Sequence, residues 1–195
     1  MPLFSSDFEN IVFQSIVGLW VFSEFVGGGI IPRLRRRGKE VTRRDKGSNL
    51  VLNVSLFVSI IIAIFLAANN TAMLPSGFFY SGIVLIVIGI LVRQWAIFTL
   101  GRFFTLTVGT QKDQKVVDYG PYRFIRHPSY LGLLIALLGI GVALQSWEGV
   151  LAIVVISGLA IGYRIYIEEK VMVLELGDDY VQYMKRTKRL IPWVV

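Results

Sequence analysis

Cysteine is absent from the 195 residues, and histidine occurs once, as His127. Without cysteine the chain has no disulfide, no thiolate nucleophile and no cysteine-based metal site. A single histidine also excludes a site built from several histidines, so no metal ligands are expected. A GxGxxG turn between a strand and a helix is missing too, which argues against a Rossmann-type dinucleotide domain. The run Gly27-Gly28-Gly29 is instead expected at the end of a helix.

Charged residues are nearly missing from five long stretches. Hydrophobic residues make up 54% of the sequence and the mean hydropathy is +0.64, whereas soluble domains are usually about 45–50% apolar. A helix needs about 20 apolar residues to cross a bilayer. The sequence therefore predicts an all-α, polytopic membrane protein with about five transmembrane helices. These helices are expected at residues 10–31, 50–68, 78–100, 130–145 and 149–167.

The predicted helices also carry local signals. The last two are joined only by residues 146–148, so they are expected to form a tight antiparallel hairpin. The first is not expected to be a cleaved signal peptide, because it is long, lacks a basic leader and follows acidic residues. Small residues favour close helix packing in membranes. That is the role expected for Gly132, Gly139, Gly141, Gly158 and Gly162.

Basic residues are missing from residues 1–9, 69–77 and 146–148. Of the 20 lysines and arginines, eight lie in residues 33–46, five in residues 102–126 and six at or beyond residue 164. Because short cytoplasmic loops accumulate lysine and arginine, this pattern predicts an outside N-terminus and a cytoplasmic C-terminus. The net charge of +7 is thus attributed to topology, and no nucleic-acid partner is expected.

Residues 101–128 form a long connection between two predicted spans. Connections beyond about 12–15 residues without secondary structure are usually functional or disordered. This one contains nine apolar or aromatic side chains that favour burial, so it is expected to be ordered. Pro128 suits the first position of a helix, whose exposed amides favour an anionic ligand group. The neighbouring His127 is either a ligand contact or a structural residue at the helix end.

A second polar segment follows the fifth span. Arg164 and Glu168 are four residues apart and share a helix face, either as a local ion pair or with Arg164 free to bind a carboxylate. Glu169 is expected to be a solvated charge. Helically spaced apolar residues continue to Tyr183. Gly177 followed by Asp178 indicates a helix stop and a cap, which predicts two short helices in the tail.

These motifs resemble those of the isoprenylcysteine carboxyl methyltransferase family. The motifs are Arg126-His127-Pro128-Ser129-Tyr130-x-Gly132, then Arg164-x₃-Glu168-Glu169, Leu176-Gly177-Asp178-Asp179-Tyr180-x-x-Tyr183 and Arg189-Leu190-Ile191-Pro192. The resemblance covers about residues 100–195. It implies a three-helix transmembrane region at 1–100 and a catalytic region at 101–195, built as one integral unit.

The resemblance implies an S-adenosylmethionine-dependent methyltransferase whose product is S-adenosylhomocysteine. Arg164 and Glu168 would be the catalytic residues, with Arg164 also binding the methyl acceptor. The implied cofactor contacts are Gln114, Lys115, Val116, Val117, Tyr122, His127, Pro128, Ser129, Tyr130 and Glu168. The first four replace a His-Thr-Leu-Val type run of eukaryotic members, a change that backbone contacts would survive.

Five spans are fewer than eukaryotic members have, so the chain is interpreted as a compact prokaryotic-type member. It is placed in the inner (cytoplasmic) membrane with its active site facing the cytoplasm. The implied acceptor is an isoprenylcysteine-type carboxylate, and a phospholipid amine or small thiol remains an alternative. A lipophilic small molecule or lipid is favoured over a protein.

Two other interpretations stay open. A membrane NADPH-dependent reductase of the sterol or steroid type could use Arg123 or Arg126 with Tyr130. A non-catalytic membrane subunit would retain the motifs only for packing. Ligand binding distinguishes the three, since each binds adenosylmethionine, NADPH or neither.

Overall fold

The computed structural model describes the chain except for residues 1–3, 5, 37–41, 70–72, 112 and 192–195, so Pro192 lies outside the described residues. The fold is helical, as predicted. Its α-helices are α1 (Asp7–Ser23), α2 (Ile31–Arg35), α3 (Ser48–Ala68), α4 (Phe78–Leu100), α5 (Pro128–Ala143), α6 (Trp147–Leu176) and α7 (Asp178–Arg186). A π-helical segment, η1 (Glu24–Ile30), joins α1 to α2, and 3-10 turns occur at η2 (Gly101–Phe103) and η3 (Gly120–Arg123). Two short strands, β1 (Thr42–Arg43) and β2 (Gly109–Thr110), pair antiparallel.

Four of the helical segments are long and apolar enough to cross a membrane. They are Asp7–Arg35, Ser48–Ala68, Phe78–Phe103 and Trp147–Leu176. The apolar helix α5 is shorter, with 16 residues. Large apolar side chains on the helix surfaces, such as Phe57, Leu91 and Leu159, are exposed rather than buried. This is the surface expected of a protein solvated by lipid tails, so the chain is an integral, multi-pass membrane protein.

Glycines bring α4 and α5 into close contact. A Cβ added at Gly132 would lie 2.5 Å from the backbone nitrogen of Arg93, and one at Gly139 would lie 2.6 Å from that of Ile86. The packing role predicted for these two glycines is confirmed. A Cβ added at Gly158 or Gly162 would meet no described atom within 4 Å. The packing predicted for that pair is therefore not found within the described chain.

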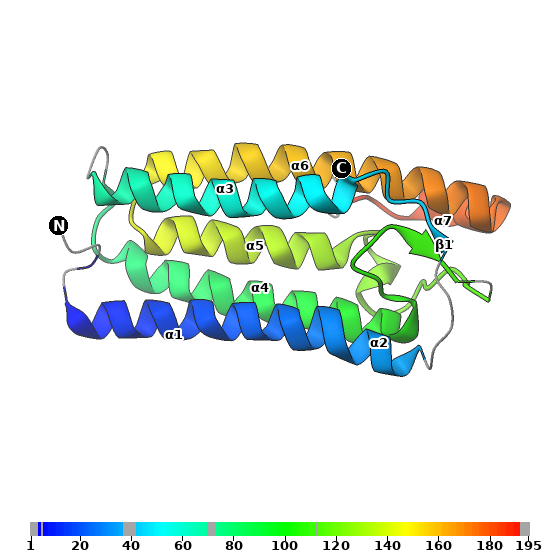
Figure 1. Ribbon diagram of the computed structural model, residues 1–195, viewed down its shortest axis with the longest axis horizontal. Helices are drawn as coiled ribbons and strands as arrows, with labels where there is room; N and C mark the ends of the chain where they lie inside the picture. Colours follow the sequence, from blue (N-terminus) through cyan, green and yellow to red (C-terminus); the bar gives the residue numbers. More distant parts are fainter. Residues whose placement is uncertain (1–3, 5, 37–41, 70–72, 112, 192–195) are drawn as a thin grey trace.

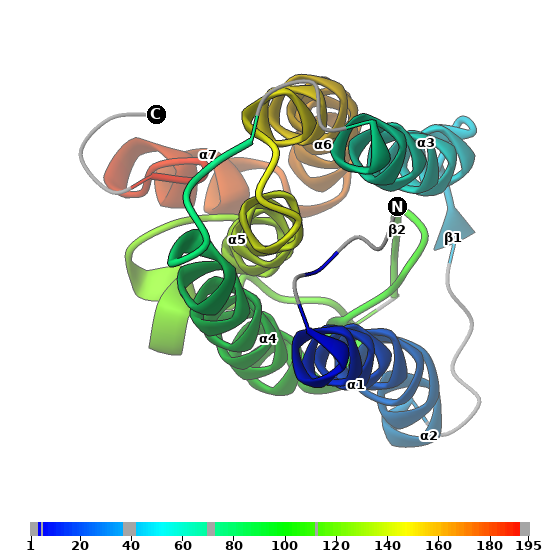
Figure 2. The same ribbon diagram turned by 90° about the vertical axis from the view of Figure 1, so that its left-hand side faces the viewer.

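The helices form a curved row in the order α1, α4, α5, α6, α3 (Figure 2). The predicted hairpin is present, with Ser146 capping α6 by accepting a hydrogen bond from the Gly149 amide at 3.1 Å. Helix α3 packs against α6 at one end of the row, where the buried hydroxyls of Ser59 and Ser157 lie 3.0 Å apart. Helices α1 and α3 stand at opposite ends of the row.

Two boundaries differ from the sequence-based expectation. Gly27, Gly28 and Gly29 lie inside η1, so the first helix continues through them to α2 instead of ending there. The fifth apolar helix runs on to Leu176, so the first of the two predicted tail helices is its continuation. The stop at Gly177 is confirmed, because this glycine has φ +57° and α7 begins directly after it.

The basic segments gather at one end of the bundle. Figure 1 places α2, β1, the 101–127 connection and α7 together at one end, and the α3–α4 and α5–α6 connections at the other. The three segments that carry most of the lysines and arginines therefore share one end, as the charge pattern predicts. The number of crossings and their orientation remain predictions.

Candidate active site

A cavity of about 650 Å³ opens among α1, α3, the 101–127 connection and the ends of α5 and α6. One part of its wall is apolar and comes from the two helices at the ends of the row. This part is lined by Val17, Trp20, Val21, Leu52, Leu56, Phe57 and Ile60. The remaining wall is rich in polar side chains and lies at the end where the basic segments gather. The cavity thus has a polar part and an apolar part. The apolar part, lined by these side chains of α1 and α3, is called the apolar arm below.

The sequence-predicted site residues converge on this cavity. Gln114, Lys115, Val116, Val117, Tyr122, His127, Ser129, Tyr130, Arg164 and Glu168 all line it. Pro128 is the exception, because it is buried at the first position of α5, where the sequence predicts it. Residues from four separate segments are therefore brought together, although their individual roles remain predictions.

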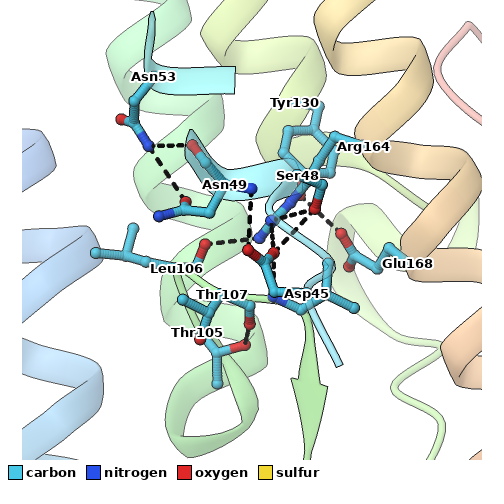
Figure 3. Close-up of polar contacts among 11 residues, drawn as sticks. Asp45, Ser48, Asn49, Asn53, Thr105, Leu106, Thr107, Tyr130, Arg164 and Glu168 are labelled. Carbon is cyan, nitrogen blue, oxygen red and sulfur yellow. Dashed lines mark hydrogen bonds and ion pairs between the residues drawn. The ribbon is translucent and has the colours of Figure 1, made fainter. Parts of the chain in front are cut away.

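Arg164 lies at the centre of a hydrogen-bond network (Figure 3). Its side chain is 2% exposed. The Nη1 atom donates to Asp45 and to the Ser48 hydroxyl at 2.8 Å, and Nη2 donates to the Leu106 carbonyl at 2.6 Å. The Nε atom donates to the Tyr130 hydroxyl at 3.0 Å. Arg164 thus joins the start of α3, the 101–127 connection and α5.

The direct ionic partner of Arg164 is Asp45, which the sequence analysis missed. Besides the hydrogen bond from Arg164, Asp45 accepts hydrogen bonds from the Ser48 hydroxyl at 2.9 Å, the Asn49 backbone amide at 3.1 Å and the Val108 backbone amide at 3.2 Å. Burial acts to raise the pKa of Asp45. The hydrogen bonds from Asn49, Ser48 and Val108 and the charge of Arg164 outweigh burial and hold that pKa below its ordinary value.

Within the described part of the chain, hydrogen bonds connect Glu168 to Arg164 through Tyr130 alone. The Tyr130 hydroxyl accepts from Arg164 and donates to Glu168 Oε2 at 2.7 Å. Among the described residues, no hydrogen bond engages the second carboxylate oxygen, Oε1. One oxygen of Glu168 is therefore held by Tyr130, and the residue lines the cavity. The local ion pair, one of the two interpretations of Arg164 and Glu168, is replaced by this bridged arrangement.

Glu169 is buried, so its interpretation as a solvated charge is wrong. Its Oε1 accepts from Arg126 Nε at 2.8 Å and lies 3.3 Å from His127 Nε2. Its Oε2 accepts from Arg189 Nε at 3.0 Å. Three cationic or polar groups thus meet on one carboxylate that is 5% exposed. These contacts connect Glu169 of α6 to Arg126 and His127, which precede α5, and to Arg189, which follows α7.

His127 has the structural role that the sequence left open, and its contact with a ligand stays a prediction. Its ring lines the cavity, and its Nε2 faces Glu169. Its backbone amide donates to the Arg189 carbonyl at 3.0 Å. His127 is therefore held from both its backbone and its ring while it forms part of the cavity wall.

The 101–127 connection is folded over the cavity. Phe104, Val108 and Tyr122 are buried, whereas Tyr119 and Phe124 are exposed, so the burial expected of its apolar residues is only partly found. The Tyr183 hydroxyl donates to the Tyr122 carbonyl at 2.7 Å and fastens the connection to α7. Burial raises the pKa of both tyrosines, so their hydroxyls stay protonated.

Two further cavity residues escaped the sequence analysis. Glu24 of η1 and Arg93 of α4 form a bidentate ion pair, and Arg93 Nη1 also donates to the Ser129 carbonyl at 3.0 Å. Charged residues inside apolar spans are costly and usually paired, which is the signal that could have found them. Glu24 is the first residue of η1, and π-helical turns are frequent at functional sites.

Comparison with known proteins gives a consistent result. The pattern of the Isoprenylcysteine carboxyl methyltransferase (ICMT) family matches residues 82–174. Protein-S-isoprenylcysteine O-methyltransferase B of Arabidopsis thaliana is 34% identical over 115 residues, which is 58% of each chain. The Schizosaccharomyces pombe protein-S-isoprenylcysteine O-methyltransferase is 30% identical over 146 residues, or 74% of this chain and 58% of that one. Over residues 82–174, a little less than half of its length, the chain is thus similar to the isoprenylcysteine carboxyl methyltransferase family.

The fold of the family extends over nearly the whole chain. A solved structure of the eukaryotic intramembrane Ras methyltransferase ICMT matches with a TM-score of 0.67 and 25% sequence identity. The match covers 93% of this chain and 65% of that one, and the chain spans about 58% of the Arabidopsis relative. Methanethiol S-methyltransferase 1 of Bradyrhizobium diazoefficiens is 36% identical over 72 residues, 37% of this chain and 24% of that protein.

Proposed function

We propose that this protein is an S-adenosylmethionine-dependent methyltransferase acting on a lipophilic acceptor. The acceptor favoured by the named relatives is an isoprenylcysteine-type carboxylate. The observation that supports this most directly is the set of residues that line the cavity. One continuous cavity is lined by the residues expected to contact the cofactor and by apolar side chains of α1 and α3. A water-soluble donor and a lipid-soluble acceptor can therefore meet inside it.

The residues present fit adenosylmethionine. The volume of about 650 Å³ lies within the range of about 300–1,000 Å³ of typical ligand sites. The Oε1 atom of Glu168 supplies an acceptor for hydroxyl or ammonium donors of the ligand. The side chain of Gln114 is held in place by two contacts. Its Oε1 accepts from the Gln111 backbone amide at 3.0 Å, and its Nε2 contacts the Met172 sulfur at 3.6 Å. The substituted run at 114–117 thus keeps a defined position in the wall.

The chain's part in the reaction is alignment. The bound donor supplies a methyl group on a sulfonium, which is already an activated leaving group. A carboxylate acceptor is itself nucleophilic at neutral pH and needs no general base. The protein must hold the acceptor oxygen, the methyl carbon and the sulfur in line and keep water out. Arg164 retains one N–H on Nη2 without a partner among the described residues, and we assign this N–H to the acceptor carboxylate.

The apolar arm explains why the site lies in a membrane protein. An acceptor with a long hydrocarbon chain reaches the cavity from the bilayer, with its chain between α1 and α3 and its polar end near Arg164. The distribution of basic residues supports a cytoplasmic location for this end of the bundle. Residues 1–100 contribute α1, α3 and α4 to the cavity wall, and residues 101–195 contain all of the proposed cofactor contacts. The two regions therefore act as one unit.

Cofactor identity is tested by calorimetric titration of the detergent-purified protein. Binding of S-adenosylhomocysteine but not NADPH, with loss of binding in Glu168→Ala, is expected. Binding of NADPH alone would instead support a sterol-type reductase. The absence of heat with both ligands would support a non-catalytic subunit.

Acceptor identity is tested by transfer of labelled methyl groups from S-adenosylmethionine. S-farnesylcysteine is expected to be labelled, and S-farnesylcysteine methyl ester provides the control, because its carboxylate is blocked while its hydrocarbon chain is unchanged. Equal labelling of both compounds would contradict O-methylation. Phosphatidylethanolamine and methanethiol test the amine and thiol alternatives in the same assay.

A further inference from the structure

Two carboxylates share the surroundings of one buried arginine, but they are bound differently. Asp45 contacts Arg164 directly, whereas Glu168 contacts it only through the Tyr130 hydroxyl. Asp45 comes from the segment before α3, 119 residues away from Arg164 in the sequence. Figure 3 shows Asp45 next to Arg164, and Glu168 on the side of the Tyr130 hydroxyl. The polar end of the cavity therefore depends on which carboxylate neutralises Arg164.

Asp45 is held firmly in its position. One carboxylate oxygen, Oδ1, accepts from the Ser48 hydroxyl and from the backbone amide of Val108 in the 101–127 connection. The other, Oδ2, accepts from the backbone amide of Asn49 at the start of α3. Pairing of β1 with β2 holds the same two segments together just beyond this point. The Asp45 carboxylate thus has a fixed geometry that does not depend on Arg164 alone.

The charge of Arg164 requires such a partner. Its side chain is 2% exposed, and an unpaired charge at such a site is unfavourable. Apart from Asp45, its hydrogen-bond partners are the neutral groups of Ser48, Leu106 and Tyr130. Without the charge of Asp45, the nearest carboxylate in the network is Glu168, which is separated from Arg164 by one hydroxyl group. Arg164 would then attract Glu168 away from the cavity.

We propose that Asp45 is a positioning residue of the methyl-transfer site, which neutralises Arg164 and so leaves Glu168 available to the cofactor. This inference rests on the proposed function, because it assigns Glu168 to S-adenosylmethionine. Asp45 acts through Arg164 and Tyr130 and does not itself contact the ligand. The Asp45–Arg164 contact joins the start of α3, which lines the apolar arm, to the residues proposed to contact the cofactor.

The substitution that tests this role is Asp45→Asn. Asparagine keeps the size of the side chain and one oxygen, which can accept from the Ser48 hydroxyl and the Val108 backbone amide, but it removes the charge and the oxygen that accepts from the Asn49 backbone amide. We expect the affinity for S-adenosylhomocysteine, measured by calorimetry, to fall about tenfold or more, since hydrogen bonds to charged groups are of that magnitude. Asp45→Glu, which keeps the charge, is expected to retain more affinity than Asp45→Asn.

A second substitution separates positioning from general structural damage. In Asp45→Asn/Arg164→Gln the buried cation is removed as well, so Glu168 is no longer attracted. The double variant is expected to bind S-adenosylhomocysteine more tightly than Asp45→Asn alone. Non-additive effects of this kind are the sign that two residues act through one another. A purely structural role of Asp45 would make the double variant weaker than either single variant.

The matched control is Glu175→Gln. Glu175 of α6 pairs with Arg44 Nε at 2.8 Å, so this ion pair joins the same two segments as Asp45–Arg164 does. Its side chains are 28% and 50% exposed, and neither residue lines the cavity. Affinity for S-adenosylhomocysteine is expected to stay within about twofold of wild type, because exposed ion pairs contribute little.

The outcomes are distinguishable. Wild-type affinity in Asp45→Asn, or additive losses in the double variant, would overturn the role of Asp45 while leaving the methyltransferase proposal intact. No binding of S-adenosylhomocysteine by the wild-type protein would overturn both. Weakened binding in Asp45→Asn with recovery in the double variant supports the inference.

Discussion

Arg93 of α4 and Glu24 of η1 form a bidentate ion pair in the wall of the cavity, with Arg93 Nη2 donating to Glu24 Oε2 at 2.6 Å. The two residues are 69 positions apart in the sequence, and their side chains are 8% and 23% exposed. Arg93 also donates to the Ser129 carbonyl at the beginning of α5. This pair therefore fixes the first helix of the chain against the segment that carries the predicted cofactor contacts.

Breaking this pair on one side is expected to destabilise the protein strongly. Arg93→Gln leaves the Glu24 carboxylate without its cation in a largely buried site, which costs about 3–5 kcal/mol. Unfolding in detergent by denaturant measures the change. Arg102→Gln is the control, because the side chains of Arg102 and its partner Asp113 are 41% and 40% exposed. An exposed ion pair of this kind contributes about 1 kcal/mol or less. Equal losses in the two variants would contradict a structural role of the Glu24–Arg93 pair.

The hydroxyl of Tyr130 is expected to matter for ligand binding more than for stability. Tyr130→Phe removes the group that accepts from Arg164 and donates to Glu168, so affinity for S-adenosylhomocysteine should fall by about tenfold. Calorimetry measures it. Tyr119→Phe removes an exposed hydroxyl that donates to the Thr99 carbonyl at 3.2 Å, and it should bind normally. Unchanged affinity in Tyr130→Phe would show that Glu168 does not need this support.

Two glycine substitutions should act in opposite directions. Gly132→Ala places a Cβ 2.5 Å from the Arg93 backbone, and overpacking of this kind costs about 1–3 kcal/mol. Gly158→Ala meets no described atom and raises helix propensity, so it should be neutral or stabilise by about 0.5–1 kcal/mol. Melting temperatures in detergent compare the two. Destabilisation by Gly158→Ala would indicate that another helix, such as one from a second copy, packs against this face.

Asp45 should give an acid-dependent contribution to stability. Its pKa is lowered from 3.8 in the folded protein, and Arg164 is the charged group that faces it. A lowered pKa means that the unfolded state binds the proton first, so the stabilisation is present above the unfolded pKa and is lost as pH falls through the folded value. The difference in melting temperature between wild type and Asp45→Asn should therefore be constant near neutral pH and shrink below about pH 4. A difference that does not change with pH would contradict this assignment.

The connection at 101–128 is expected to be stabilised by the cofactor. Gln114, Lys115, Val116 and Val117 line the cavity, so a ligand there would add contacts to this segment. Limited proteolysis with and without S-adenosylmethionine measures the effect, with cleavage slowed by the ligand. Equal cleavage rates would argue against contacts between this segment and the cofactor.

Much of the fold could be predicted because its signals are local. Apolar runs of sufficient length indicate spans, and the predicted range 78–100 coincides with α4. Pro128 and Gly177 mark a helix start and a helix stop that the structure confirms. The extent of the first and last long helices was less predictable. Neither the π-helical turns at Gly27–Gly29 nor the continuation of α6 beyond the apolar run leaves a distinct pattern in a short window of sequence.

The sequence by itself determined the helical membrane class, the clustering of basic segments and the set of motif residues that meet in the cavity. Hydropathy, charge and helix-end preferences depend on neighbouring residues, so they can be read along the chain. Only the tertiary structure decided that Arg164 pairs with Asp45, that Arg93 pairs with Glu24 and that Glu169 is buried among cations. Such pairings depend on how the helices rotate and pack against one another, because burial makes an unpaired charge costly and leaves the choice of partner to geometry.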